Sequence, residues 1–283
     1  MKTNKILVGV DFGPATDSVI AYSSFFAATM DASLHLLYVV DYLVTPPAYL
    51  APYFEEEKKA AEEKFLPLKE KLRCSDIKVR TEVIMGRLHE SFDLAMQRTK
   101  SDMIILGFRR HALRRSSSEK LIKSLRIPML VVRGEKAEAA YKSTNIRRIL
   151  CPVDFSDISG RALEAAKELA DQFSCKLHVL HVIHGEMITK MIAKSGKGQE
   201  ILKQLLEEFR LTMLNFLNKF GIIGEGVIEE GEPDKVIVSY ARKEDVDLIV
   251  IGARGIGRIK EMLIGSTTDA VLKTSACPVF VIH

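Results

Sequence analysis

The sequence predicts an α/β fold: two tandem, doubly wound, open parallel sheets of five strands each. Three observations lead to this prediction. Short apolar, β-branched runs alternate with amphipathic segments, the whole pattern occurs twice, and a polar stretch separates the two copies. Continuous apolar runs of this kind are typical of strands that are buried on both faces of a parallel sheet, and helical crossovers join such strands.

The repeat begins at the first predicted strand. Ile6–Phe12 aligns with Ile149–Phe155 at an offset of 143 residues, and the same offset carries Leu34–Val39 onto Leu177–Val182. Three later matches continue the repeat at offsets of 145, 145 and 150 residues: Gly86 with Gly231, Asp102–Gly107 with Asp247–Gly252, and Pro128–Val132 with Pro278–Ile282. The last step in the offset means that five residues are missing from the final connection of the first copy. Self-similarity at this period indicates a duplicated domain.

The elements of the second copy can be derived from the residue pattern, taken in order. Five strands are expected, the third being the weakest: Arg148–Val153, Lys176–Ile183, Gly224–Glu229, Leu248–Ile251 and Val279–Ile282. The helices expected between them are Ser159–Phe173, Gln199–Phe220, Asp234–Lys243 and Ser266–Thr274. In the first copy, the proline-rich stretch Pro46–Pro52 is expected to be a loop before a charged helix, Glu55–Lys71. The polar stretch Gly134–Asn145 carries no core pattern, so it is expected to link domains 1–134 and 146–283.

The composition limits the classes of function. With 41 basic and 37 acidic residues, the chain is too balanced in charge for a dedicated nucleic-acid binder. No apolar run approaches the ~18–20 residues of a membrane span, and no N-terminal signal region is recognised. The four cysteines form no CxxC pair, which argues against zinc and indicates a reduced, cytoplasmic protein: Cys74, Cys151, Cys175 and Cys277.

A candidate ligand site lies where two strands of the second copy end, because open α/β sheets bind ligands at the carboxyl ends of their strands. The first strand closes with Pro152, Val153 and Asp154, and a glycine-rich segment follows the fourth strand. The residues of that segment that could hold phosphates are Ile251, Gly252, Arg254, Gly255, Gly265, Ser266 and Thr267. Glycine lets the backbone approach phosphate oxygens, and the free N–H groups of a first helical turn attract anions.

The same segment has a purely structural interpretation. In it, Gly252 ends a strand, Gly255 makes a turn, and Ser266 forms a capping box with Asp269. Neither a GxxxxGK[ST] loop nor the dinucleotide-binding fingerprint is present, so no well-known phosphate motif decides between the two.

The glycine spacing, Gly252-x2-Gly255-x9-Gly265-Ser266, resembles the ATP-binding branch of the universal stress protein family. The start at Val153–Ser156 and the closing CysProValPheValIle strand resemble that family too, over two family units. The resemblance implies an adenine nucleotide α-hydrolase-like fold whose units pair through their last strands, internally or in a homodimer. It implies ATP as the ligand, with Mg²⁺ as an optional companion. Asp154, with the backbone near Pro152 and Val182, would line the adenosine side, and the glycines would hold the ribose and phosphates.

The first copy departs from this motif. Gly107 matches Gly252, but Arg110 and Arg115 stand where the second copy has Gly255 and Gly265. Ser116 and Glu119 keep a capping-box spacing, and Asp11 is retained. Two long cationic side chains are expected to fill the phosphate space. The first copy is therefore predicted to be a retained fold that does not bind ATP and serves as a built-in partner.

Other residue groups are interpreted as structural. A basic cluster is read as a solvated loop, with an anion, a phosphorylated partner or nucleic acid as the alternative: Arg109, Arg110, Arg114 and Arg115. Histidines on the second strands are read as structural rather than metal-binding: His35, His178, His181 and His184. Lysines beside Gly196 and Gly198 suggest a movable segment over the second-copy site: Lys190, Lys194 and Lys197.

Three classes of function remain open. The leading hypothesis is a stress-response protein that binds ATP in its C-terminal domain and uses occupancy as a signal to an unidentified protein partner. The second is an enzyme of the related fold, either a transferase or a slow ATPase, or one in which Ser266 or Thr267 accepts a phosphoryl group. The third is a scaffold without nucleotide.

Overall fold

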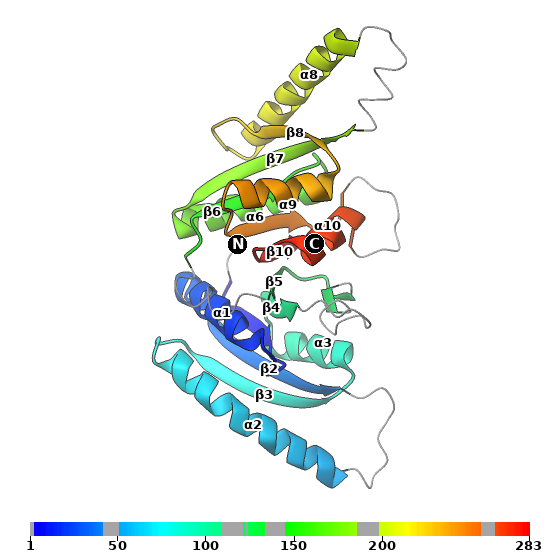
Figure 1. Cartoon of the computed structure of the whole chain (residues 1–283). Coiled ribbons are helices and arrows are strands. Elements are labelled where there is room, and N and C mark those ends of the chain that lie inside the picture. Colours follow the sequence, from blue (N-terminus) through cyan, green and yellow to red (C-terminus); the bar gives the residue numbers. More distant parts are fainter. Residues whose placement is uncertain are drawn as a thin grey trace. The chain divides into compact units, whose positions relative to one another are not determined.

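The computed structural model in Figure 1 describes residues 3–41, 51–108, 121–122, 124–133, 145–185, 198–255 and 264–283. The chain divides into two compact units, Lys2–Thr144 and Asn145–His283. Each unit is an α/β fold with its own parallel five-stranded sheet. The predicted linker lies outside the described residues except for Asn145, and the domain bounds and the pairing of units through their last strands stay predictions.

The N-terminal unit has the strand order β3-β2-β1-β4-β5. Its strands are β1 (Lys5–Gly9), β2 (Ser33–Asp41), β3 (Val79–Gly86), β4 (Met103–Phe108) and β5 (Met129–Arg133). Its helices with given bounds are α1 (Thr16–Met30), α2 (Ala51–Arg73) and α3 (Leu88–Thr99). Figure 1 shows α2 running beside the outer strand β3.

The C-terminal unit repeats this arrangement in the order β8-β7-β6-β9-β10. Its strands are β6 (Arg148–Pro152), β7 (Lys176–His184), β8 (Val227–Gly231), β9 (Leu248–Gly252) and β10 (Val279–Ile282). Its helices are α6 (Asp157–Phe173), α8 (Gly198–Lys219), α9 (Pro233–Lys243) and α10 (Ser266–Thr274). The strands β6 and β9 are almost entirely buried because helices cover both faces of the sheet, as their continuous apolar runs predict.

The duplication extends to backbone conformation. Four positions with left-handed φ in the first unit have left-handed counterparts in the second: Phe12 (53°) with Phe155 (65°), Asp31 (51°) with Ser174 (52°), Asp76 (57°) with Gly221 (62°), and Lys100 (54°) with Asp245 (49°). In each unit, one aspartate also accepts two backbone N–H groups at the beginning of the first strand. Asp102 Oδ2 accepts the N–H groups of Asn4 and Lys5 at 2.7 and 3.0 Å, and Asp247 Oδ2 accepts those of Arg147 and Arg148 at 2.8 and 3.0 Å.

The five residues missing from the first copy lie outside its strands. Ile104 pairs with Met129 in the first unit, whereas the equivalent Ile249 pairs with Val279 in the second, five residues further along the chain. The registers of the other strands match between the units, for example Ile6 with Leu34 and Ile149 with Leu177. The deletion therefore shortens the connection between β4 and β5 and leaves the sheet unaltered.

Two predicted boundaries were wrong. Ala51 and Pro52 were expected in a loop, but they begin α2, because proline is tolerated in a first helical turn where no N–H partner is needed. The third strand of the second copy begins at Val227 rather than Gly224, which has φ 141°. No helix within the described part of the chain is long and apolar enough to cross a membrane.

Candidate functional site

The carboxyl ends of β6, β7 and β9 meet at one edge of the C-terminal sheet, since β6 pairs in parallel with both neighbours. Pro152 and Ile251 are buried at the ends of β6 and β9, and Val153 follows β6 with 5% exposure. Val182 lies near the end of β7 and is half-buried, as is Arg254 beyond β9. The topology therefore brings the predicted site residues to a common edge.

A tight turn joins β6 to α6 and positions Asp154. Asp154 Oδ1 accepts the N–H of Ser156 at 3.1 Å and its hydroxyl at 2.6 Å. The Ser156 hydroxyl in turn accepts the N–H of Ser159 at 3.2 Å, so Ser156 is the N-cap of α6. A carboxylate that bonds the backbone two residues on is a common device for fixing such turns. The carboxylate is thereby held at the helix start.

Gly255 lies directly against this carboxylate. A Cβ built on Gly255 would come within van der Waals overlap of Asp154 Oδ2 and within 3.3 Å of its Cγ. Two loops far apart in the sequence thus meet without room for a side chain on the glycine. Gly255 is not among the residues with left-handed φ. The close approach to Asp154 thus accounts for a glycine here, and a left-handed φ does not.

Gly252 has a different role, which its counterpart in the first unit shares. A Cβ on Gly252 would lie 2.8 Å from Ile158 Cγ2 on α6, and a Cβ on Gly107 would lie 3.2 Å from the Cβ of Ala15, the equivalent residue. The first glycine of the motif therefore lets a strand end pack against the following helix. This packing is needed in both units and says nothing about a ligand.

Gly265 is the open position of the three. A Cβ there would have its nearest neighbours at 3.6–3.8 Å, which is ordinary contact. The N–H of Gly265 donates to the Ala253 carbonyl at 2.7 Å. This hydrogen bond joins the two ends of the segment between β9 and α10. Gly265 is the N-cap of α10, and no side chain caps this helix. Its first-turn N–H groups, from Ser266 onward, thus remain as donors for an anion.

The capping box proposed for Ser266 and Asp269 is wrong. Ser266 is already helical, so the cap lies one residue earlier, and the Asp269 carboxylate bonds Lys273 Nζ at 2.6 Å instead. Thr268 is buried, and its hydroxyl donates to the Gly252 carbonyl at 2.8 Å. Ser266 is exposed and Thr267 is half-buried, so these two are the hydroxyls of this turn that solvent reaches.

His181 is a residue of this edge whose role sequence reasoning missed. It is 8% exposed, and its Nδ1 donates to the Val153 carbonyl at 2.8 Å. Its ring lies between Phe155 and Phe209, with centroid distances of 4.3 and 5.0 Å. His181 thereby fixes the chain that leads into Asp154. The sequence did hold a signal for this role. The aligned residue of the first copy is Tyr38, so both copies have an aromatic ring at this position.

The buried environment of His181 predicts a pH dependence of stability. Burial lowers the pKa of the imidazole below its ordinary value of 6.5. Below that pH the unfolded chain binds more protons than the folded chain, so the free energy of unfolding falls as the pH drops from 6.5 toward the folded-state pKa. His181→Tyr, which installs the first-copy residue, is expected to remove this slope in urea denaturation between pH 7.5 and 5.5. The exposed His184→Gln variant should keep it, and an equal slope in all three proteins would contradict the prediction.

Two other histidines have structural partners. His35 Nε2 lies 2.8 Å from Glu82 Oε2, and His178 Nδ1 lies 3.0 Å from the Tyr240 hydroxyl. The described residues contain no group of three or more His, Cys, Asp or Glu side chains that could hold a metal ion. The predicted arginine cluster, the first-copy capping pattern at Ser116 and the lysines proposed as a lid lie outside the described residues.

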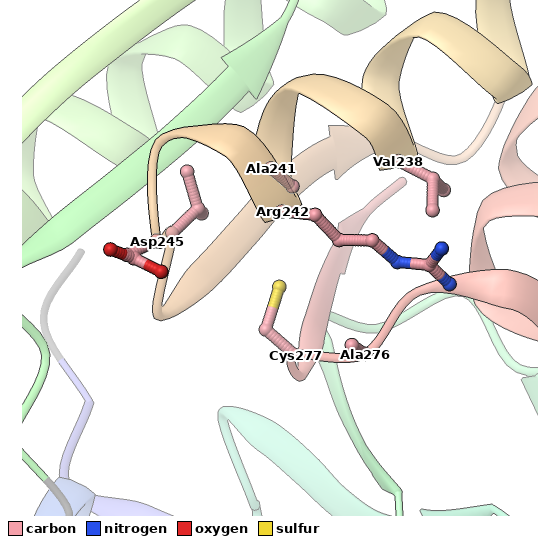
Figure 2. A pocket seen from close by; sticks show the side chains of 7 residues that line it. Val238, Ala241, Arg242, Asp245, Ala276 and Cys277 are labelled. Atoms are coloured by element: carbon pink, nitrogen blue, oxygen red, sulfur yellow. The ribbon is translucent and has the colours of Figure 1, made fainter.

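A separate small cavity of about 250 Å³ opens between α9 and the chain before β10. Figure 2 shows the Cys277 sulfur pointing toward α9, with Arg242 and Asp245 extending away from each other. Burial raises the pKa of the Cys277 thiol, and the Ser275 hydroxyl lies 3.4 Å from its sulfur. A thiol with a raised pKa is a poor nucleophile, which argues against Cys277 as a reactive residue of this cavity.

Comparison with known proteins gives one consistent result. A sequence profile described as the Universal stress protein family matches residues 2–133 and again residues 145–283. The universal stress protein YxiE of Bacillus subtilis is 31% identical over 145 residues, covering 48% of this chain and 98% of its own. A universal stress protein of Methanocaldococcus jannaschii is 31% identical over 156 residues, covering 50% and 96%. The crystal structure of a universal stress protein from Archaeoglobus fulgidus superposes on the whole chain, covering 99% of its own, with a TM-score of 0.74 and 23% identity, which supports the fold.

Proposed function

The chain belongs to the universal stress protein family, and on this basis we propose that its C-terminal unit binds ATP and reports occupancy to a partner in the stress response. The N-terminal unit keeps the fold without the glycine loop and acts as a built-in companion. A regulator of this kind needs binding and release of the nucleotide, and it does not need rapid turnover.

The observation that carries the proposal is the open space at Gly265. Gly252 and Gly255 have neighbours inside the protein that exclude a side chain, whereas a Cβ on Gly265 meets ordinary contacts only. Packing against the described residues of the unit thus does not explain a glycine at this position. An anion held by the first turn of α10 would explain it, because phosphate oxygens approach the N–H groups closely only where no side chain intervenes.

The remaining predicted residues fit roles around such an anion. Ser266 and Thr267 have accessible hydroxyls that can donate to phosphate oxygens. Asp154 is an acceptor fixed by Ser156, suitable for a ribose hydroxyl. Since no carboxylate cluster occurs among the described residues, a Mg²⁺ ion that accompanies ATP would take most of its ligands from phosphate and water.

The two aspartates at equivalent turns provide a matched test. Asp154→Asn removes the charge while keeping the size of the side chain, and it is expected to weaken ATP binding about tenfold, which is about 1.4 kcal/mol. Asp11→Asn makes the same change in the first unit, where Asp11 Oδ1 accepts the Gly13 N–H at 2.8 Å, and should leave ATP affinity unchanged. Isothermal titration calorimetry of the full chain with ATP, ADP and AMP measures both.

Three results would count against this proposal. If the wild-type chain binds no adenine nucleotide, the scaffold class is favoured. If the two variants weaken ATP binding equally, the nucleotide is not confined to the C-terminal unit. Phosphate release at about 10 per second, the typical rate of an enzyme, would favour the enzyme class.

A further inference from the structure

The N-terminal unit has a larger cavity of about 710 Å³ at the amino ends of β1, β2 and β3. This is the opposite end of the strands from the turn that holds Asp11. The ends of α2 and α3 complete its wall, with Arg73 from α2 and Arg98 from α3. The volume falls within the range of sites for small organic molecules.

The wall of this cavity is strongly basic. Its permanently charged side chains are Lys5, Arg73, Lys78, Arg80 and Arg98, against one carboxylate, Asp76. The side chains of Arg73, Lys78 and Arg80 make no ion pair with any described residue. An excess of like charge on a concave surface concentrates the potential and attracts ions of the opposite sign.

A second carboxylate beside the cavity, Glu82, contacts two of its lining residues. Glu82 Oε2 lies 2.8 Å from His35 Nε2, and Glu82 Oε1 accepts a hydrogen bond from Arg98. His35 and Arg80 are register partners on adjacent strands, so their side chains share one face of the sheet. With Glu82 included, the cavity still has five permanently charged cations against two carboxylates.

The second unit has fewer cations at the matching positions. Its backbone also differs there, since β3 begins at Val79, whereas the aligned Gly224 has φ 141° and β8 begins at Val227. The left-handed residues Asp76 and Gly221 fix the alignment of the two connections. In the second unit the three cations without ion pairs become neutral or acidic: Arg73 corresponds to Asn218, Lys78 to Ile223 and Arg80 to Glu225. The fold therefore does not require cations at these positions, and their presence in the first unit needs another explanation.

We propose that this cavity binds a small solute carrying two or three phosphate groups. Guanidinium groups suit phosphate because they donate two parallel hydrogen bonds to it, and Arg73 and Arg80 supply two of them beside Lys78. The site is separate from the ATP site proposed above and lies in the other unit. The first unit thus has a ligand of its own at the opposite end of its sheet.

Inorganic tripolyphosphate is the probe, titrated into the full chain by calorimetry. The variant Arg73→Asn with Arg80→Glu installs the second-unit residues and is expected to weaken tripolyphosphate binding at least tenfold. The control, Lys203→Glu with Arg210→Asn, makes the same change in net charge on the exposed surface of α8 and should bind as the wild type does. Gly265→Arg, which is directed at the ATP site, should also leave tripolyphosphate binding intact. Circular dichroism checks the fold of each variant.

Three results would overturn the proposal. The first is the absence of tripolyphosphate binding by the wild type. The second is equal weakening in the cavity variant and the α8 control, which would indicate general attraction by net charge. The third is binding that is lost in Gly265→Arg and kept in the cavity variant, which would assign the probe to the C-terminal unit. A single-stranded RNA that binds more tightly than tripolyphosphate, and is lost in the cavity variant, would replace the small solute with a polymer.

Discussion

Replacing Gly265 with arginine is expected to abolish ATP binding while leaving the C-terminal unit folded. Gly265 has φ −71° and ψ 156°, which any residue adopts, and the nearest described atom to a Cβ there is Arg254 Cα at 3.6 Å. The long side chain would, however, occupy the space in front of the first turn of α10. We expect at least a 100-fold loss of affinity, about 2.7 kcal/mol, and a melting temperature within about 2 °C of the wild type.

The measurement is calorimetric titration of ATP combined with thermal denaturation of the same samples. Arginine is the informative substitution, since the first copy carries Arg115 at the aligned position. Gly265→Ala is the matched control and should have a smaller effect, because one methyl group fits the open space. ATP binding that survives Gly265→Arg unchanged would refute the assignment of the site, whereas unfolding of the variant would show that Gly265 serves the fold.

Unlike Gly265→Arg, Gly252→Ala is expected to lower the stability of the C-terminal unit. The new Cβ would lie 2.8 Å from Ile158 Cγ2 and 3.3 Å from the carbonyl carbon of the same residue. Forcing an extra methyl group into such a contact typically costs about 1–3 kcal/mol. Gly107→Ala is the milder counterpart, with neighbours no closer than 3.2 Å. Urea denaturation followed by circular dichroism measures both.

A double-mutant cycle identifies the cause. Ile158→Ala introduces the residue of the first copy, Ala15, and removes the Cγ2 atom that clashes. Gly252→Ala combined with Ile158→Ala should be less destabilising than the sum of the single changes, by about 0.5–3 kcal/mol. Strict additivity would show that the stability loss arises elsewhere.

The sheet could be predicted from the sequence because buried parallel strands have a periodicity that needs no tertiary information. Val279–Ile282 and Ser266–Thr274 were predicted to the residue, and the five-residue deletion was placed correctly between β4 and β5. The prediction of the α10 N-cap failed because several residue types can occupy an N-cap position. A serine three residues before an aspartate fits a capping box, yet the helix is capped at Gly265, one residue earlier.

The site was only partly predictable for a related reason. Sequence spacing grouped three glycines as one motif, but it could not show that Gly252 faces a helix and Gly255 faces a carboxylate. These are contacts between segments that are distant in the sequence. The hydrogen bond from His181 to Val153 was also inaccessible, since the strand pattern gives the face of a residue and not its partner.

The left-handed turn shared by Phe12 and Phe155 bears on how the two copies have diverged. A bulky residue at positive φ costs of order 1–3 kcal/mol, a burden that drift would remove wherever nothing maintains it. The first copy has arginine at two of the three glycine positions of its sister, yet Phe12 is still left-handed, and its ring centroid lies 5.0 Å from those of both Tyr38 and Phe65. The two copies therefore share the aromatic packing at this turn and differ in the glycine-rich loop. The turn belongs to the common architecture of the two units, and the glycine-rich loop is where they diverge.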